Sequence, residues 1–220
     1  MKNSFFAGLL SLTLMISCQS GKQQLTNYVN PFLGTATLWE TKDLGYERHL
    51  KTRTWGAEVF PGSSVPNAMV QLSPVTQFRS GAGYQYEDTV IYGFSHTNKG
   101  HWNLLHLPIL PVTGNVSSDD YASKYSHTNE SAHPGYYQVF LERYGVNAEL
   151  TSTLRCAYHK YTFRPDDDKK VLVDITRTNN GVRDWSIQKV DDHTFSGNQD
   201  AEGNIRFYAV SNYKIQDIKQ

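Results

Sequence analysis

The feature that most constrains the fold is a period-two alternation of side chains in the stretch VNAELTSTLRCAYHKY, residues 146–161. One set of alternate positions carries Val146, Ala148, Leu150, Ser152, Leu154, Cys156 and Tyr158. The other set carries Asn147, Glu149, Thr151, Thr153, Arg155 and His159. Successive side chains of a β-strand point to opposite faces of a sheet, so this stretch predicts one long, half-buried strand.

Shorter stretches repeat the alternation. The predicted inward positions are Val171, Val173 and Ile175 in KVLVDITRT, and Ile205, Phe207 and Ala209 in NIRFYAVSNY. GYYQVFLERYG is predicted to pair with the strand at 146–159 through the tight turn RYGVN, and Met69–Leu72 is predicted to form a short apolar strand. Turn signals recur at short intervals, and no later segment has the pattern of a three-turn amphipathic helix. The expected fold is therefore all-β, an antiparallel β-sandwich.

The N-terminus is typical of an export signal. Lys2 precedes an apolar stretch, Phe5–Ile16, that is too short to span a bilayer as a helix. Because Ser17 and Cys18 follow aliphatic residues, the segment resembles a bacterial lipoprotein cleavage box, in which residues 1–17 are removed and Cys18 is lipidated. Ordinary signal cleavage is the alternative. Residues 18–26 are then a flexible linker, and the mature chain is expected in the periplasm or on the outer membrane or cell surface.

Composition limits the partners. The net charge is zero, so neither nucleic acid nor an anionic membrane is indicated, and a membrane is expected only through the lipid anchor. With Cys18 lipidated, Cys156 has no disulfide partner and is expected to be a small buried residue. The 14 Tyr, 10 Phe and 4 Trp suit both an extracytoplasmic β protein and a carbohydrate binder.

The most polar and aromatic loop is GFSHTNKGHWN, residues 93–103. His96, His101 and His106 are spaced by five, which suits zinc ligands on neither a helix nor a strand. Ser95 beside His96 lacks the strand–turn–helix context of a nucleophile. Two interpretations stay open, a polar structural loop and a sugar site. In the sugar site the Trp102 ring would stack on a pyranose, and polar side chains would bind its hydroxyl groups.

Glycoside hydrolysis requires two carboxyl groups flanking the scissile bond. The acidic residues mostly occur in clusters typical of solvated turns, at 87–88, 119–120, 166–168 and 191–192. Glu58, beside turn and aromatic residues, is the one acid of interest. No residue is therefore assigned as catalytic, and none as a metal ligand.

Five motifs, in order along the chain, resemble the N-terminal region of the glycoside hydrolase family 92 α-mannosidases. They are YVNPFLGT (28–35), VFPGSSVPNAMVQLSP (59–74), GYQYEDTVIYGFSHT (83–97), HPGYYQVFL (133–141) and VNAELTSTLRCAYHKYTF (146–163). The resemblance extends from about Asn27 to about Asn212. It implies a supersandwich of the galactose-mutarotase-like type for residues 27–220.

The resemblance also implies a secreted or lipid-anchored, inverting, calcium-dependent exo-α-mannosidase that acts on α-mannoside glycans. In that family the sandwich packs on a C-terminal (α/α)6 barrel, which is absent from this chain and holds most catalytic carboxylates and calcium ligands. Calcium is thus expected in a full-length enzyme and not on this chain alone. The loop is carried over as pocket-lining, with substrate-binding positions at His96, Thr97, Asn98, Lys99, His101 and Trp102.

The resemblance is imperfect after Thr97. Many members have a Ser-Gly-Thr-Gly run followed by acids at this point, whereas this chain reads NKGHWNLLHLPILP, so the preferred linkage can differ. The chain stops at YKIQDIKQ, just after a predicted strand, which indicates an interrupted domain without activity of its own. The alternatives are a stand-alone carbohydrate-binding lipoprotein and a non-functional truncated remnant.

Overall fold

The computed structural model describes residues 24–37, 56–98 and 104–218. The predicted signal peptide, Cys18 and most of the loop at 40–60 lie outside the described residues. The strands are β1 (Ser73–Val75), β2 (Val90–Ile91), β3 (Gly93–Ser95), β4 (Ile109–Thr113), β5 (Ser123–Lys124), β6 (Glu130–His133), β7 (Tyr136–Leu141), β8 (Val146–Ser152), β9 (Ala157–Thr162), β10 (Lys169–Val173), β11 (Asp184–Lys189), β12 (Thr194–Ala201) and β13 (Gly203–Val210). Two 3-10 turns, η2 (Leu25–Tyr28) and η4 (His127–Asn129), are the helical elements of the described part.

The first layer is a four-stranded antiparallel meander in the order β6-β7-β8-β9. The predicted hairpin is confirmed, because Leu141 of β7 faces Val146 of β8 across a tight turn. Gly145 in that turn has a φ of +65°, and a Cβ there would come within 3.0 Å of the Arg164 guanidinium. Glycine suits this position because other residues enter the left-handed region only at a cost.

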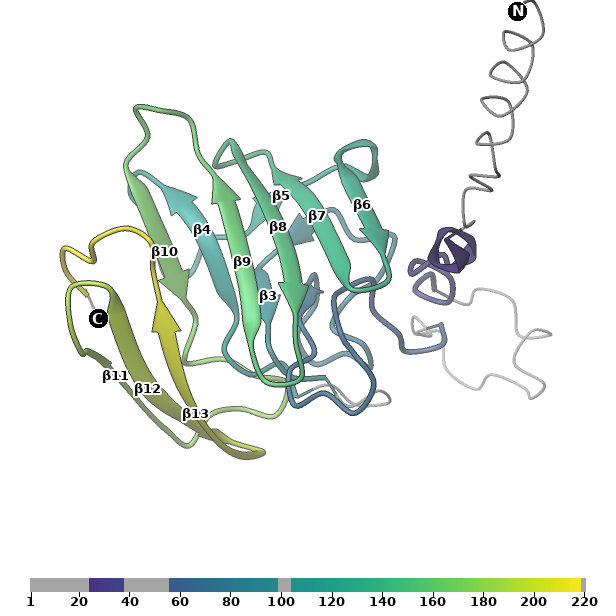
Figure 1. Ribbon diagram of the computed structural model, residues 1–220. Helices are drawn as coiled ribbons and strands as arrows, with labels where there is room; N and C mark the ends of the chain where they lie inside the picture. The colour runs from purple at the N-terminus through teal and green to yellow at the C-terminus, as the bar shows by residue number, and fades with distance from the viewer. Residues whose placement is uncertain (1–23, 38–55, 99–103, 219–220) are drawn as a thin grey trace, which may run out of the picture.

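The second layer is the antiparallel sheet β1-β3-β4-β10, and it faces the first (Figure 1). The core between the layers contains Leu72, Tyr84, Ile91, Phe94, Leu110, Val112, Tyr121, Tyr125, Tyr137, Val139, Leu141, Tyr144, Val146, Ala148 and Leu150. A two-stranded ribbon, β2-β5, flanks this core. The predicted antiparallel β-sandwich is therefore confirmed.

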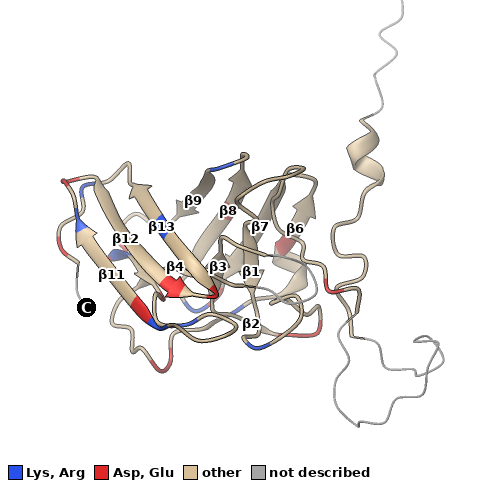
Figure 2. Cartoon of the chain, turned by 90° about the horizontal axis from the view of Figure 1, so that it is seen from below, with Lys and Arg blue, Asp and Glu red and all other residues tan. Residues whose placement is uncertain are grey.

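A third sheet, β11-β12-β13, is contributed by the C-terminal part of the described chain. Its Phe207 packs in a smaller cluster with Leu107, Ile109 and Ile175, which joins it to the β4–β10 side of the sandwich. Acidic and basic residues are interspersed along this sheet (Figure 2). Arg183, directly before β11, forms an ion pair with Asp200 of β12. Within the described residues, no helix is long and apolar enough to cross a membrane.

The prediction of one strand through residues 146–159 is wrong. The chain turns at residues 153–156, where the Thr153 amide donates to the Cys156 carbonyl at 2.8 Å, and then returns as β9. The four-residue turn reverses the phase, because Leu150 of β8 is paired with His159 of β9. Leu154 and Tyr158 are consequently 55% and 58% exposed, and Cys156 is exposed rather than buried.

Two other strand predictions need correction. Val171 is 48% exposed, because Leu172, which pairs with the buried Leu110 of β4, is the residue of β10 that packs against the core between the layers. Met69 is 68% exposed, and the strand expected from Met69 begins only at Ser73. The inward set of the last strand is confirmed, with Phe207 buried and Tyr208 and Val210 exposed.

Candidate functional site

The segment around His96 continues the hydrogen bonding of β3 beyond its end. The His96 amide donates to the His106 carbonyl at 3.0 Å, and the Leu105 amide donates to the Thr97 carbonyl at 3.2 Å. Leu105 and Leu107, on the returning side, have φ values of 54° and 52°. Left-handed backbone is costly for leucine, so the base of this loop is held in shape by its surroundings.

His96 is part of a hydrogen-bonded chain that links the two layers of the sandwich. Its Nδ1 lies 2.8 Å from the Leu107 carbonyl oxygen, and its Nε2 lies 3.0 Å from Nε2 of His159. The Tyr161 hydroxyl lies 2.7 Å from Nδ1 of His159. A carbonyl only accepts, so Nδ1 of His96 donates, its Nε2 accepts from His159, and Nδ1 of His159 accepts from Tyr161. Both imidazoles are neutral in this arrangement.

The surroundings favour the neutral rings. Burial lowers the pKa of His96 to about 4, against a smaller opposing effect of the hydrogen bond to Leu107. Burial also holds the pKa of His159 well below its usual range, and the neighbouring His96 adds to this effect. Low-dielectric surroundings disfavour the charged form of a histidine. The pair therefore stays neutral near pH 7 and joins β9 to the segment after β3.

Thr97 and Asn98 lie at the base of the same loop and are buried. The Thr97 hydroxyl oxygen accepts from the His106 amide at 3.0 Å and lies 2.8 Å from Nδ1 of His106. The backbone amide of Asn98 donates to Oε1 of Gln71 at 3.2 Å. The structure thus brings His96, Thr97 and Asn98 together in one ordered loop base.

The other three substrate-binding positions, Lys99, His101 and Trp102, lie outside the described residues. Their predicted role at the rim of a sugar pocket stays a prediction, as does that of the loop base.

Sequence reasoning missed a buried carboxylate at Glu130. Its side chain is 1% exposed, and it accepts from the Tyr137 hydroxyl at 2.6 Å and from the Tyr84 hydroxyl at 3.1 Å. Nδ1 of His127 lies 2.6 Å from the same carboxylate. Burial, followed by the proximity of Glu130, raises the pKa of Tyr84 and Tyr137 far above the usual range of a phenol. Glu130 therefore anchors the start of β6 to the core.

Asp174 is a second buried carboxylate that sequence reasoning missed, with a side chain 6% exposed. It accepts from Nε of Arg177 at 2.7 Å and from the hydroxyl groups of Thr176 and Tyr121. The Arg177 guanidinium lies 4.8 Å from the centre of the Tyr121 ring, a cation–π distance. The sequence did contain one signal of this ion pair, an Asp followed three residues later by an Arg, but that spacing does not show that the Asp carboxylate is buried.

These carboxylates serve the fold. Glu130 and Asp174 each bind neighbouring side chains, and no hydrogen bond connects the two groups among the described residues. Glu58, the acid singled out in the sequence, has a backbone φ of 54°. Its side chain packs against Gly81. Within residues 24–37, 56–98 and 104–218, no group of three or more His, Cys, Asp or Glu could hold a metal ion.

Comparisons with known proteins match this architecture. The glycosyl hydrolase family 92 N-terminal domain matches residues 28–219. The search of curated proteins gave no match. Among solved structures, the family GH92 α-mannosidase BT3965 from Bacteroides thetaiotaomicron is 30% identical, with a TM-score of 0.74, 88% of this chain covered and 27% of that chain.

Two further solved structures agree. The family GH92 inverting mannosidase BT2199 from Bacteroides thetaiotaomicron VPI-5482 is 26% identical, with a TM-score of 0.63, 79% of this chain covered and 22% of that chain. The GH92 family glycosyl hydrolase ccman5 is 26% identical, with a TM-score of 0.57, 68% of this chain covered and 23% of that chain. This chain spans about a quarter of the length of these structures. The chain belongs to glycoside hydrolase family 92, as its N-terminal domain.

Proposed function

We propose that this chain is the N-terminal domain of an α-mannosidase that removes terminal α-mannosyl residues from glycans. The domain supplies loops to the rim of the substrate pocket and a packing surface for the catalytic domain. The supporting observation is the family match over residues 28–219, together with 30% identity to a family GH92 α-mannosidase. The described carboxylates that are buried stabilise the fold, and the proposal assigns the acid and the base to the C-terminal domain of a full-length family enzyme.

In an inverting enzyme, one carboxylic acid protonates the leaving oxygen while a carboxylate activates water on the opposite face of the sugar. This chain's contribution is positioning. The loop base is fixed by the His96–His159 pair and by Thr97 bound to His106. A base held in this way gives the loop that follows Asn98 a fixed point of attachment at the pocket rim.

Calcium requires six to eight oxygen ligands, supplied mostly by carboxylates and carbonyls. The described residues offer no group of three acidic or metal-ligating side chains, so they do not fit such a site. The proposal places the ion in a full-length family enzyme.

A chimera tests the proposal. Residues 27–218 replace the corresponding N-terminal domain of BT3965, and mannose release from α-mannosides is measured with calcium present. We expect the chimera to hydrolyse these substrates, BT3965 without an N-terminal domain to lose activity, and the isolated 220-residue chain to be inert. A folded but inactive chimera, or mannose release by the isolated chain, would contradict the proposal.

The rival function is a stand-alone carbohydrate-binding lipoprotein that uses the same loop. It is favoured if the isolated chain binds yeast mannan saturably and if Trp102→Ala abolishes that binding. Aggregation of the isolated chain would instead favour a non-functional remnant. Lipid attachment is a separate proposal, and incorporation of radiolabelled palmitate into the wild-type chain but not into Cys18→Ser tests it.

A further inference from the structure

Besides the loop at His96, a polar surface lies on the outer face of the sheet β6-β7-β8-β9. Alternate residues of these strands point away from the core, opposite to the buried Tyr137, Val139 and Ala148. The outward positions include Ser131, Tyr136, Gln138, Phe140, Asn147, Glu149, Tyr158 and Lys160. The sequence analysis assigned none of them to a site, and the proposed function assigns them no role.

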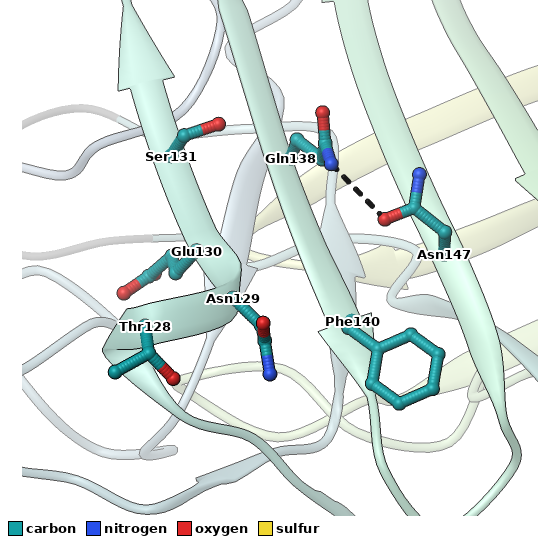
Figure 3. A pocket seen from close by; sticks show the side chains of 7 residues that line it. All are labelled: Thr128, Asn129, Glu130, Ser131, Gln138, Phe140 and Asn147. Carbon is teal, nitrogen blue, oxygen red and sulfur yellow. Dashed lines mark hydrogen bonds between the residues drawn. The ribbon is translucent and has the colours of Figure 1, made fainter.

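This face is hollowed where β7 turns into β8. The hollow has a volume of about 500 Å³, within the range of sites for small molecules. It is lined by Thr128, Asn129, Ser131, Gln138, Phe140 and Asn147 (Figure 3). Glu130 also borders it, but its carboxylate is buried and points away from Gln138 and Asn147, toward the tyrosine cluster.

The amide side chains of the hollow are oriented in advance. Nε2 of Gln138 donates to Oδ1 of Asn147 at 3.2 Å, and the single proton of the Tyr136 hydroxyl is shared between Oε1 of Gln138 and Oε1 of Glu149, each at 2.9 Å. This chain of bonds turns the oxygen of Asn147 toward Gln138 and its amide nitrogen away, as Figure 3 shows. The two N–H groups of Asn147 and one of Gln138 thus remain for a ligand. Fixed donors lower the ordering cost of binding.

The lining is neutral. Its side chains are amides, hydroxyls and the Phe140 ring, with the Glu130 charge turned inward. The nearest charges on this face, Glu149 and Lys160, are paired at 2.7 Å. Phosphate-bearing ligands depend on lysine and arginine, which this hollow lacks. An apolar ring beside oriented amide donors instead matches a pyranose, which has a C–H face and a rim of hydroxyl groups.

The hollow is also remote from the loop of His96. That loop base is tied through Gln71 to the end of the sheet where β8 turns into β9, since the Met69 amide donates to the Leu154 carbonyl. The hollow lies at the opposite end of these strands (Figure 1). We propose that this hollow is a second glycan-binding site, which takes one neutral sugar residue and needs no catalytic domain; the expectation that this residue belongs to a mannan chain rests on the proposed function.

The experiment uses the 220-residue chain and α-mannopentaose as the probe, followed by NMR of the side-chain amides. We expect saturable shifts of the Asn147 and Gln138 amide signals. Asn147→Asp keeps the shape and the acceptor for Gln138 but removes the two donors, and Phe140→Ala removes the stacking ring. Each is expected to weaken binding about tenfold, the effect of one net hydrogen bond or apolar contact. Tyr158→Ala, at the other end of the face, is the matched control.

The outcomes separate this site from the loop. Binding that survives Trp102→Ala but is weakened by Asn147→Asp and Phe140→Ala supports the second site, whether or not the chimera hydrolyses mannosides. Binding that is lost with Trp102→Ala and unchanged by the other two variants overturns it. Absence of any shift at Asn147 and Gln138 with millimolar probe overturns it as well. Unchanged circular dichroism of each variant shows that the fold is intact.

Discussion

The free energy of unfolding of the sandwich should fall at acidic pH because of the His96–His159 pair. The native pKa of His96 is about 4, and an unfolded histidine titrates near 6.5. Between these values the unfolded chain binds more protons than the native one, so stability falls as pH falls. The contribution of neutral His96 to the free energy of unfolding is fully present above about pH 6.5 and is lost progressively as the pH falls toward 4. For one such group the loss between pH 7 and pH 5 is about 2 kcal/mol.

Urea unfolding followed by tryptophan fluorescence at pH 7, 6 and 5 measures this loss. The double variant His96→Gln and His159→Gln removes both imidazoles, so its stability should fall by at least about 2 kcal/mol less over the same range. His133→Gln changes an exposed histidine on the outer face and should leave the pH dependence as in the wild type. If the double variant shows the same pH dependence as the wild type, this half-buried pair is not the source and the reasoning fails.

Three further predictions concern the fold. Glu130→Gln should cost about 2–3 kcal/mol in urea unfolding, because the Tyr84 and Tyr137 hydroxyls and His127 lose a buried charged acceptor, whereas Asp119→Asn on the surface should cost under about 0.5 kcal/mol. Gly145→Ala should lower stability by about 1 kcal/mol or more, since φ is +65° there, and an unchanged urea midpoint would refute the strain. Cys156, exposed in the β8–β9 turn, should react with a thiol reagent in the native state about as fast as in urea, and protection would contradict its placement.

The sequence alone was sufficient for the fold class. Period-two alternation reports which side chains of a strand share a face, and this pattern is local, so it could be read without tertiary information. The hairpin at Leu141–Val146 was predictable for the same reason, because a glycine turn joins two alternating stretches. The family motifs likewise depend on local sequence and order.

Local pattern could not locate the turn at 153–156, because the alternation continues through it without a break. The turn contains neither glycine nor proline, the usual signals. Its position decides which residues of β9 face inward. His159 therefore appeared as a polar outward residue in the sequence, and only the structure places it against His96.

The buried carboxylates and the outer hollow show the same division. In the sequence Glu130 and Asp174 are ordinary acids, and their burial depends on tyrosines up to 53 positions away along the chain. Gln138 and Asn147 become one surface only through the register of β7 against β8. The sequence by itself determined the β-sandwich and the family, because strand periodicity and motif order are local. Only the tertiary structure decided which polar groups meet, because pairing between distant strands brings them together.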